Sequence, residues 1–173
     1  MAVQKILEIP NPILKEKTTK ITKFDEEVRK LITDLKDTLA SAHNPEGAGL
    51  SSNQIGIAKR VCVVRNFKDN LQANGVDSVP SFVEKILINP KIVSKSKENN
   101  IEWEGCLSVP NQYGKVSRAT KIKVAYQDEE GKRMKLSATG FFARVIQHEI
   151  DHLDGIVFTD RVKGKLVPES FFL

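Results

Sequence analysis

Two histidines near the carboxyl end of the chain, His148 and His152, bracket Glu149 in the pattern His-Glu-x-x-His. Residues four apart on a helix lie one above the other on the same face, so the two imidazoles can bind one metal ion. Glu149 would then lie beside that ion, where its carboxylate can accept a proton from water. The alternative is a core helix that carries two histidines by chance. The chain has only three histidines, however, and two of them stand at ligand spacing.

The residues around this pair favour a buried helix. One face carries, at spacings of four, three and four, Phe141, Val145, His148 and His152. Further apolar residues flank that face on both sides, and a helix that is apolar over so much of its circumference is buried. Thr139 or Ser137 can cap the start of this helix, and Gly155 is a natural stop.

A catalytic metal usually takes three protein ligands and leaves one position for water, so a third ligand is needed. The metzincin pattern requires a histidine six residues after His152, but that position is Phe158. Glu169 falls in a short tail, and His43 ends a predicted helix, where a solvated role is more natural. Cys106 offers a thiolate, which is a strong ligand for zinc or ferrous iron. Without the histidines, Cys106 would be interpreted as a small buried hydrophobic residue.

Three stretches of the chain, taken in order, resemble the motifs of one enzyme family. They are GAGLSSNQIG at 47–56, EGCLSVP at 104–110 and HEIDHLDG at 148–155. Together they are similar to the three ordered motifs of the peptide deformylases, and the resemblance covers most of the chain. One departure is that the family more often has two alanines where this chain has Ser51 and Ser52. Both residues are small, so the turn should survive, and a hydroxyl there could add a local hydrogen bond.

The resemblance implies a metal-dependent hydrolase that removes the N-formyl group from the formylmethionine of newly made polypeptides and releases formate. Cys106, His148 and His152 would hold one divalent metal ion. Glu149 would accept a proton from water and deliver one to the leaving amine. The family implies Fe²⁺ as the natural metal, although a Cys-His-His set also accepts Zn²⁺, Ni²⁺ or Co²⁺.

The first motif would bring Gln54 beside the metal, and Gly49 would let the backbone and the substrate approach closely. By resemblance, the side-chain amide of Gln54 and the backbone N–H of Leu107 stabilise the oxyanion that develops during hydrolysis. On its own, the 47–56 stretch could equally be a plain turn. A dinucleotide-binding loop is excluded, because Ser52 stands where that fingerprint requires glycine.

Three more residues are candidates around this centre. Phe141 and Val145 lie below His148 on the helix, so they should line an apolar slot that suits a methionine side chain. Both could equally be ordinary core residues. Glu104 could orient a ligand histidine through a hydrogen bond, or it could be a surface ion-pair partner.

The composition is that of an ordinary globular protein. With 173 residues, 40% of them apolar and 28% charged, we expect one catalytic domain over residues 1–173. No apolar run is long enough to span a membrane, and residues 1–20 lack the apolar core of a signal peptide, which predicts a cytoplasmic protein. Cys62 lies in a strand-like run and Cys106 in a motif, so a disulfide framework is not indicated.

The net charge of +5 comes mostly from lysine and indicates a solvated surface. We expect no direct reading of nucleic acid, because the chain has no arginine-rich stripe with interleaved aromatic residues. Attraction to the ribosome surface would suit an enzyme whose expected substrates are N-formylmethionyl nascent peptides. We expect a monomer without a membrane partner.

Periodicity predicts the remaining elements. Apolar residues at spacings of three and four indicate an amphipathic helix from Asp25 to Ala42, stopped by Asn44-Pro45. The predicted strands are 60–65, 86–93 (one bent strand or a pair), 121–127, 133–137 and 156–158. The polar stretch 67–84 should be a surface excursion. Together these elements predict an α+β fold, with antiparallel β-sheets wrapped around a central metal-binding helix and the N-terminal helix packed outside.

Two other classes of protein share parts of this pattern. A metallopeptidase would share His-Glu-x-x-His but should have a downstream ligand, which this chain lacks. A binding protein that kept the fold without catalysis should have lost Glu149, Cys106 or Gln54, and all three are present.

Overall fold

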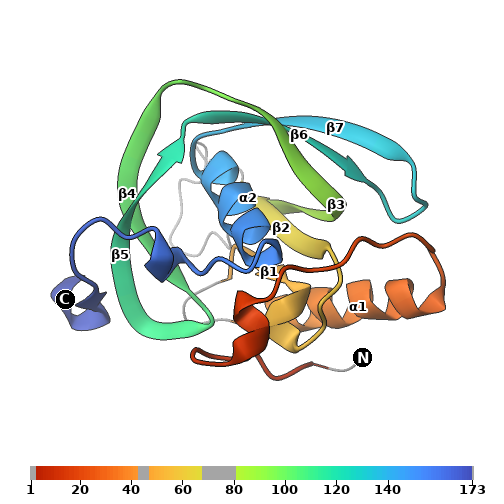
Figure 1. Ribbon diagram of the computed structural model, residues 1–173, viewed down its shortest axis with the longest axis horizontal. Helices are drawn as coiled ribbons and strands as arrows, with labels where there is room; N and C mark the ends of the chain where they lie inside the picture. Colours follow the sequence, from red (N-terminus) through yellow and green to blue (C-terminus); the bar gives the residue numbers. More distant parts are fainter. Residues whose placement is uncertain (1–2, 43–46, 68–80, 173) are drawn as a thin grey trace.

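The computed structural model describes residues 3–42, 47–67 and 81–172. Within these ranges the chain forms two α-helices, α1 (Glu26–Ser41) and α2 (Gly140–Leu153) (Figure 1). The strands of the same ranges are β1 (Gly49–Ser51), β2 (Val61–Phe67), β3 (Phe82–Lys95), β4 (Asn99–Cys106), β5 (Val109–Ala119), β6 (Lys121–Gln127), β7 (Arg133–Thr139) and β8 (Val167–Pro168). Short 3-10 helices are η1 (Pro12–Lys15), η2 (Ser52–Ile55), η3 (Phe158–Asp160) and η4 (Glu169–Phe172).

The strands form two antiparallel sheets. The first has the order β1-β2-β3-β6-β7, and the second has the order β4-β5-β8. The long strand β3 belongs to the first sheet and the next strand, β4, to the second, so the chain crosses between the sheets at the turn that joins them. In Figure 1, α2 occupies the interior, and it contacts β1, β2, β6 and β7 of the first sheet as well as β5 of the second. The predicted α+β fold around a central helix is confirmed.

Strand β2 separates the two helices. Val61 and Val63 pack in one core with α1, whereas Cys62 and Val64 pack in another core with α2. Alternate side chains of a strand point to opposite faces, so α1 and α2 cover opposite faces of the first sheet. This explains why all four of these residues are fully buried and the strand is apolar on both faces. The amphipathic helix predicted over 25–42 is confirmed, with Asp25 as its N-cap.

The ends of α2 follow the sequence signals. Thr139 occupies the N-cap position, although its side chain makes no capping hydrogen bond. After the helix, Gly155 adopts a left-handed conformation with φ of +76°, and a Cβ at this position would lie 2.4 Å from the carbonyl oxygen of Lys15. Only glycine fits both constraints, so Gly155 ends the helix where predicted.

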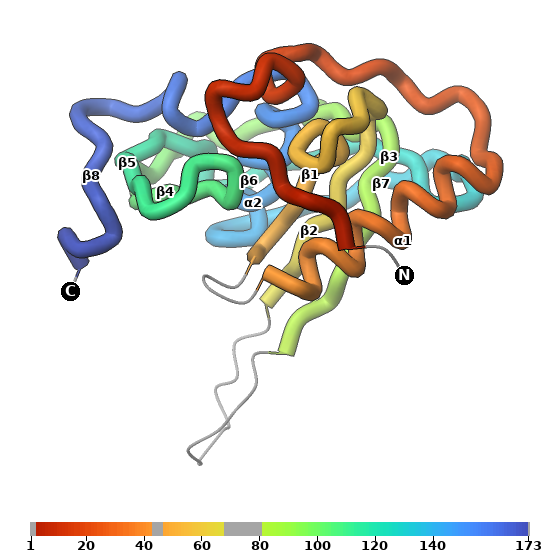
Figure 2. Tube along the Cα trace, turned by 90° about the horizontal axis from the view of Figure 1, so that it is seen from below, coloured from red at the N-terminus to blue at the C-terminus, as the bar shows by residue number. Residues whose placement is uncertain are grey.

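The N-terminal segment ties two of the sequence motifs together. It runs along η2 and past the turn between β4 and β5 (Figure 2). The backbone N–H of Leu7 donates to the carbonyl of Gln54 at 2.8 Å, and that of Ile9 donates to the carbonyl of Ser108 at 3.0 Å. Two segments that lie more than fifty positions apart in the sequence are thereby held in a fixed relative position.

One predicted element and one alternative interpretation are corrected. The strand predicted over 156–158 is wrong: Val157 precedes the 3-10 helix η3, and the ring of Phe158 is buried against His148, with centroids 6.3 Å apart. The stretch 47–56 is not a plain turn, because Gly49–Ser51 forms strand β1, paired with β2.

The prediction of a surface excursion is wrong at the two ends of the stretch 67–84. Phe67 pairs with Phe82 in the β2–β3 ladder, so both ends of that stretch belong to strands. Residues 68–80 lie outside the described residues, as do His43 and the Asn44-Pro45 helix stop. The residues predicted as a strand or strand pair over 86–93 belong to one strand, β3. Its pairing with β6 shifts register between Ile88 and Lys91 and again between Ile92 and Ser94.

Among the helices of the described residues, none combines the length and the apolar character needed to cross a membrane.

Candidate metal centre and active site

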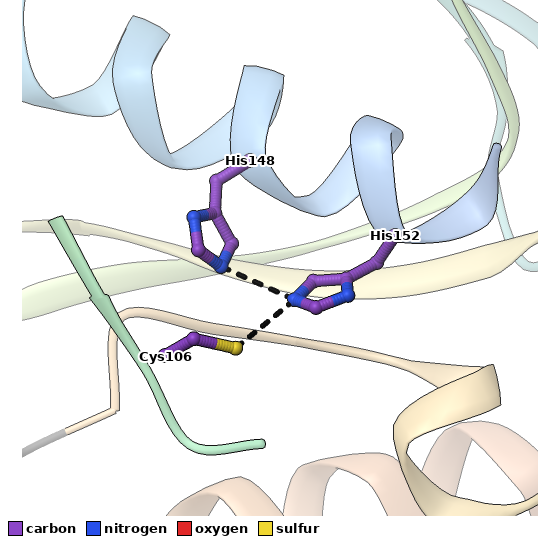
Figure 3. A group of neighbouring side chains, drawn as sticks. All are labelled: Cys106, His148 and His152. Carbon is purple, nitrogen blue, oxygen red and sulfur yellow. Dashed lines mark hydrogen bonds between the residues drawn. The ribbon is translucent and has the colours of Figure 1, made fainter. Parts of the chain in front are cut away.

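The structure brings the three predicted ligands together (Figure 3). His148 and His152 lie one turn apart on α2, and Cys106 is the last residue of β4. His152 Nε2 lies 3.2 Å from Cys106 Sγ and 3.2 Å from His148 Nε2. All three donor atoms lie within 4.8 Å of one another.

This geometry fits a shared ion. Two imidazole nitrogens that each lie about 2.1 Å from one tetrahedral ion are about 3.4 Å apart. The two Nε2 atoms are 3.2 Å apart, which is close to this value. A thiolate and two neutral imidazoles also form a donor set that divalent transition metals prefer.

His148 is oriented by Glu104, the residue predicted to support a ligand histidine. Its Nδ1 lies 3.1 Å from Glu104 Oε2, which leaves Nε2 facing the other two donors. The same carboxylate accepts two hydrogen bonds of 2.9 Å from Arg118 and one of 2.6 Å from Arg144. Burial alone would raise the pKa of Glu104, but Arg118 and His148 outweigh burial and hold that pKa well below its usual range. Glu104 is therefore a buried, ionised carboxylate and not a surface ion-pair partner.

The charged network continues from Glu104 to α2. Arg118 also donates to Asp151 of α2, and the guanidinium of Arg161 reaches the other oxygen of Asp151 at 2.7 Å. The sequence interpretation missed these partners. The available signal was the presence of two further charged residues, Arg144 and Asp151, on a helix that was predicted to be buried; both prove to be buried. Nothing in the sequence singled out Arg118, because its role depends on the pairing of β4 with β5.

Gln54 is held beside the donor atoms. Its Oε1 accepts a hydrogen bond of 2.9 Å from the backbone N–H of Ser51, which fixes the orientation of the amide. Its Nε2 donates to Ser108 Oγ at 3.1 Å and lies 3.6 Å from Cys106 Sγ. The side chain is 2% exposed, so it is not a surface amide. Leu107 follows Cys106 directly and lines the cavity that is described below.

Glu149 is buried next to the ligand pair. Its Oε2 accepts a hydrogen bond of 2.5 Å from the Ser51 hydroxyl. Burial raises the pKa of Glu149 above its ordinary value, and His148 and Ser51 offset this only in part. A carboxylate with a raised pKa is a stronger base, which suits proton transfer near neutral pH. A Cβ at Gly49 would lie 2.6 Å from Glu149 Oε1, so Gly49 permits a close approach to this carboxylate.

A cavity of about 370 Å³ opens in front of these groups. Its wall includes Glu149, Gln54 and two of the three metal-ligand candidates, Cys106 and His148. Phe141 and Val145 line it as well, Phe141 with 56% of its surface exposed and Val145 almost fully buried. The cavity wall also contains residues that the sequence interpretation did not single out, Trp103 and Tyr113 among them.

The 3-10 helix η4 packs against Trp103 and Tyr113 of the cavity wall. The ring of Phe172 lies 5.2 Å from that of Trp103 and 5.3 Å from that of Tyr113, both in edge-on geometry. The ammonium of Lys115 lies 5.2 Å from the centre of the Trp103 ring.

The chain is similar to known proteins over nearly its whole length. The sequence model of the polypeptide deformylase family matches residues 3–166. The peptide deformylase of Heliobacterium modesticaldum is 40% identical over 164 residues, which is 95% of this chain and 97% of that protein.

Two solved structures are similar along nearly the whole chain. The peptide deformylase of Ehrlichia chaffeensis has a TM-score of 0.81 at 34% identity. The match covers 94% of this chain and 89% of the Ehrlichia chain. A class I type b peptide deformylase of Acinetobacter baumannii, solved with Met-Ala-Ser bound, has a TM-score of 0.81 at 29% identity, with coverage of 93% and 99%. The chain thus belongs to the peptide deformylase family, the hydrolases that remove the N-formyl group from nascent polypeptides.

Proposed function

We propose that Cys106, His148 and His152 hold the divalent metal on which deformylation by this protein depends, within one catalytic domain that spans residues 1–173. The observation that carries this proposal is the convergence of one sulfur and two nitrogens within 4.8 Å. The support of His148 by Glu104 strengthens the proposal, because carboxylates commonly orient ligand histidines in this way. Fe²⁺ is the metal that we assign by family resemblance, with Zn²⁺, Ni²⁺ and Co²⁺ as substitutes that the same donors accept.

We assign roles to the surrounding residues from the family resemblance, and their positions around the cavity support these assignments. When bound, a divalent metal supplies Lewis acidity, which makes water a usable nucleophile near neutral pH. Glu149 accepts the proton of the attacking water and returns a proton to the leaving amine. The Nε2 of Gln54 and the backbone N–H of Leu107 donate to the oxygen of the formyl carbonyl as negative charge develops on it. Ser51 fixes the Gln54 amide in advance, so no reorientation is needed during the reaction.

The substrate that we assign is the N-formylmethionyl end of a nascent peptide. Phe141 and Val145 give the cavity an apolar side next to His148, which suits the thioether chain of methionine. The Acinetobacter baumannii relative solved with Met-Ala-Ser bound supports this choice. We place the enzyme in the cytoplasm as a monomer that meets its substrates near the ribosome, and the net charge of +5 supports that encounter.

Formate release tests the assigned reaction. The protein, purified without oxygen, should release formate from formyl-Met-Ala-Ser, leave acetyl-Met-Ala-Ser intact, and leave internal peptide bonds uncleaved. Cleavage of an internal bond at a comparable rate would favour a metallopeptidase and contradict the assignment.

Removing a ligand should remove the metal. We expect Cys106→Ala and His148→Ala to lower the bound metal from about one ion per chain to nearly none, because two remaining donors seldom retain a catalytic ion. Metal analysis after purification without oxygen measures this directly and also identifies the ion. Cys62→Ala is the matched control, because the thiol of Cys62 is buried in β2 outside the donor cluster. A Cys106→Ala protein that kept a full metal complement would remove Cys106 from the site.

Truncating Phe141 should weaken peptide binding without unfolding the protein. More than half of this side chain is exposed, so Phe141→Ala removes substrate contact with little loss of core packing. We expect KM for formyl-Met-Ala-Ser to rise about tenfold, which corresponds to about 1.4 kcal/mol of lost apolar contact, with kcat unchanged. Val93→Ala, a truncation of another exposed apolar residue outside the cavity wall, should leave KM unaltered. An unchanged KM in Phe141→Ala would exclude Phe141 from the substrate slot.

A further inference from the structure

The outer face of the first sheet is basic over β3, β6 and β7. Ile122 and Val124 of β6 pack in the core with α2. Side chains of a strand alternate between its two faces, so the neighbouring Lys121 and Lys123 point away from α2. Residues paired in register share a face, and the pairing of β6 with β3 and β7 extends this outer face across three strands. It carries five exposed basic residues, and we call this surface the basic face: Lys91, Lys121, Lys123, Arg133 and Lys135.

The basic face accounts for the whole net charge of the chain. The sequence has 27 basic and 22 acidic residues, so without these five the remaining 22 basic residues balance the 22 acidic ones. Within the described ranges none of the five forms an ion pair, and neither β6 nor β7 contains an acidic residue. The excess positive charge of the protein is therefore concentrated on one surface.

The basic face is free to meet a partner. Helix α1 lies on the same side of the sheet, but it packs mainly against β1 and β2. At one end the face is hollowed by a depression of about 630 Å³, which is lined by Arg133, Lys135 and, from the N-terminal segment, Lys20. Among the described residues, none that lines the catalytic cavity comes from β3, β6 or β7. A partner bound to the basic face would thus leave that cavity open.

Protection of the sheet edge explains only part of this charge. Basic side chains on an edge strand discourage pairing with other chains, and β7 is the edge strand of the first sheet (Figure 1). This accounts for Arg133 and Lys135. Strands β3 and β6 are paired on both sides, so they have no free edge to protect. Lys91, Lys121 and Lys123 therefore require another explanation.

We propose that the basic face binds RNA through its phosphate backbone and holds the enzyme where nascent peptides are made. This inference rests on the proposed function, because a nascent peptide is attached to a particle that is rich in RNA. Lysine and arginine contact phosphates without regard to base sequence. The other outward side chains of β6 and β7 are small or polar, and the hydroxyls of Ser137 and Thr139 can donate to phosphate oxygens.

The same positions disfavour other contacts. No outward side chain of β6 or β7 is aromatic, so the face has no group that would stack on a base. Surfaces that bind anionic membranes combine basic residues with large apolar anchors, and these outward positions carry none. The face therefore suits a phosphate backbone better than single-stranded bases or a lipid surface.

Binding to a labelled RNA duplex of about 20 base pairs tests the proposal, with fluorescence anisotropy measured at several salt concentrations. The logarithm of the binding constant should fall with the logarithm of the salt concentration with a slope of about −4, as for four to five phosphate contacts. Replacing both Lys123 and Lys135 by glutamine should weaken binding at about 0.1 M salt by about tenfold or more and reduce the slope by about two. A second duplex of different sequence should bind equally well.

The matched control replaces both Lys163 and Lys165 by glutamine. These residues are exposed, form no ion pair within the described ranges, and lie near β8, outside the basic face. The control changes the net charge by the same amount, and it should bind the duplex within about twofold of wild type. An equal loss in both double variants would show that binding follows net charge alone and would overturn the proposal. Binding to phosphatidylglycerol vesicles without binding to the duplex would overturn it as well.

Formate release separates this inference from the function on which it rests. Both double variants should keep the wild-type kcat/KM for free formyl-Met-Ala-Ser, because the basic face does not line the cavity. On ribosome-bound formylated nascent chains at low salt, only the Lys123 and Lys135 double variant should be slower, by about threefold or more. Equal rates of both variants on these chains, or an active enzyme that does not bind the duplex, would overturn the RNA-binding role alone. Duplex binding by a protein that releases no formate would instead contradict the proposed function.

Discussion

Glu149→Gln should lower kcat for formate release about 1,000-fold or more while the protein keeps its metal. Glutamine has nearly the size of glutamate, so it fits the same space between Ser51 and Gly49. Its amide cannot accept and return a proton, so the step assigned to Glu149 is lost. The residues that line the substrate slot are untouched, and KM should stay within a few-fold of wild type. Formate release and metal content, measured on the same preparation, give both quantities.

Asp154→Asn is a suitable control for this variant. Asp154 is the C-cap of the same helix and pairs with Arg60 at 2.8 Å, but it does not line the cavity. We expect kcat of Asp154→Asn to stay within a few-fold of wild type. A Glu149→Gln enzyme with full metal and more than a tenth of wild-type turnover would rule out Glu149 as the general base.

Glu104→Gln should have the second largest effect, on stability. It would leave the buried guanidinium groups of Arg118 and Arg144 without their shared anionic partner. Breaking a buried ion pair from one side typically costs about 3–5 kcal/mol, and the remaining partners, Asp151 for Arg118 and the half-exposed Glu102 for Arg144, place the expected loss at the lower end of that range. The variant should also bind metal more weakly, since His148 loses the acceptor that orients it. Denaturant unfolding and metal titration measure these two effects separately.

Glu102→Gln is the matched control for the loss of stability. Glu102 Oε2 lies 3.2 Å from Arg144 Nε, an ion pair without hydrogen-bond alignment, and its side chain is 52% exposed. Exposed ion pairs contribute about 1 kcal/mol or less, so this variant should unfold almost like the wild type. Equal losses in Glu102→Gln and Glu104→Gln would show that the buried network does not stabilise the fold in this way.

The pH dependence of stability should change as well. Because the pKa of Glu104 is lower in the folded than in the unfolded protein, its ionised form stabilises folding. A glutamate in the unfolded protein has a pKa of about 4.3. The stabilisation is therefore fully present above about pH 5, and it is lost as the pH falls toward the lower pKa that Glu104 has in the folded protein. Between pH 5 and pH 3 the wild type should therefore lose stability more steeply than Glu104→Gln. Unfolding curves at several pH values test this, and parallel slopes would contradict it.

The parts of the site that lie within one element could be predicted from the sequence. His148 and His152 share a face of α2 because their spacing is fixed by the helix itself, and Gly155 ends that helix in a left-handed conformation that favours glycine. The hairpin of β6 and β7 also follows from alternation and a turn between two short runs. Cys106 was reached by eliminating other ligands and by family resemblance, since no local rule connects it with a helix more than forty residues away.

The parts that depend on long-range pairing could not be predicted. Strand β5 escaped prediction because Pro110, Asn111 and Gly114 interrupt its alternation. Its partner role for β4 is nevertheless what brings Arg118 beside Glu104. The short apolar run that ends at Phe158 has the composition of a strand, but the Phe158 ring packs against His148. Periodicity does not distinguish these two uses of an apolar residue.

The position of Trp103 has a practical consequence, because the chain has no other tryptophan. Its indole lies in the cavity wall and rests against Phe172. The emission of an indole shifts to shorter wavelength when water around it is replaced by less polar groups. The intrinsic fluorescence of the unlabelled protein should therefore report peptide occupancy in real time. Excitation near the red edge of protein absorbance isolates this single fluorophore from the tyrosines.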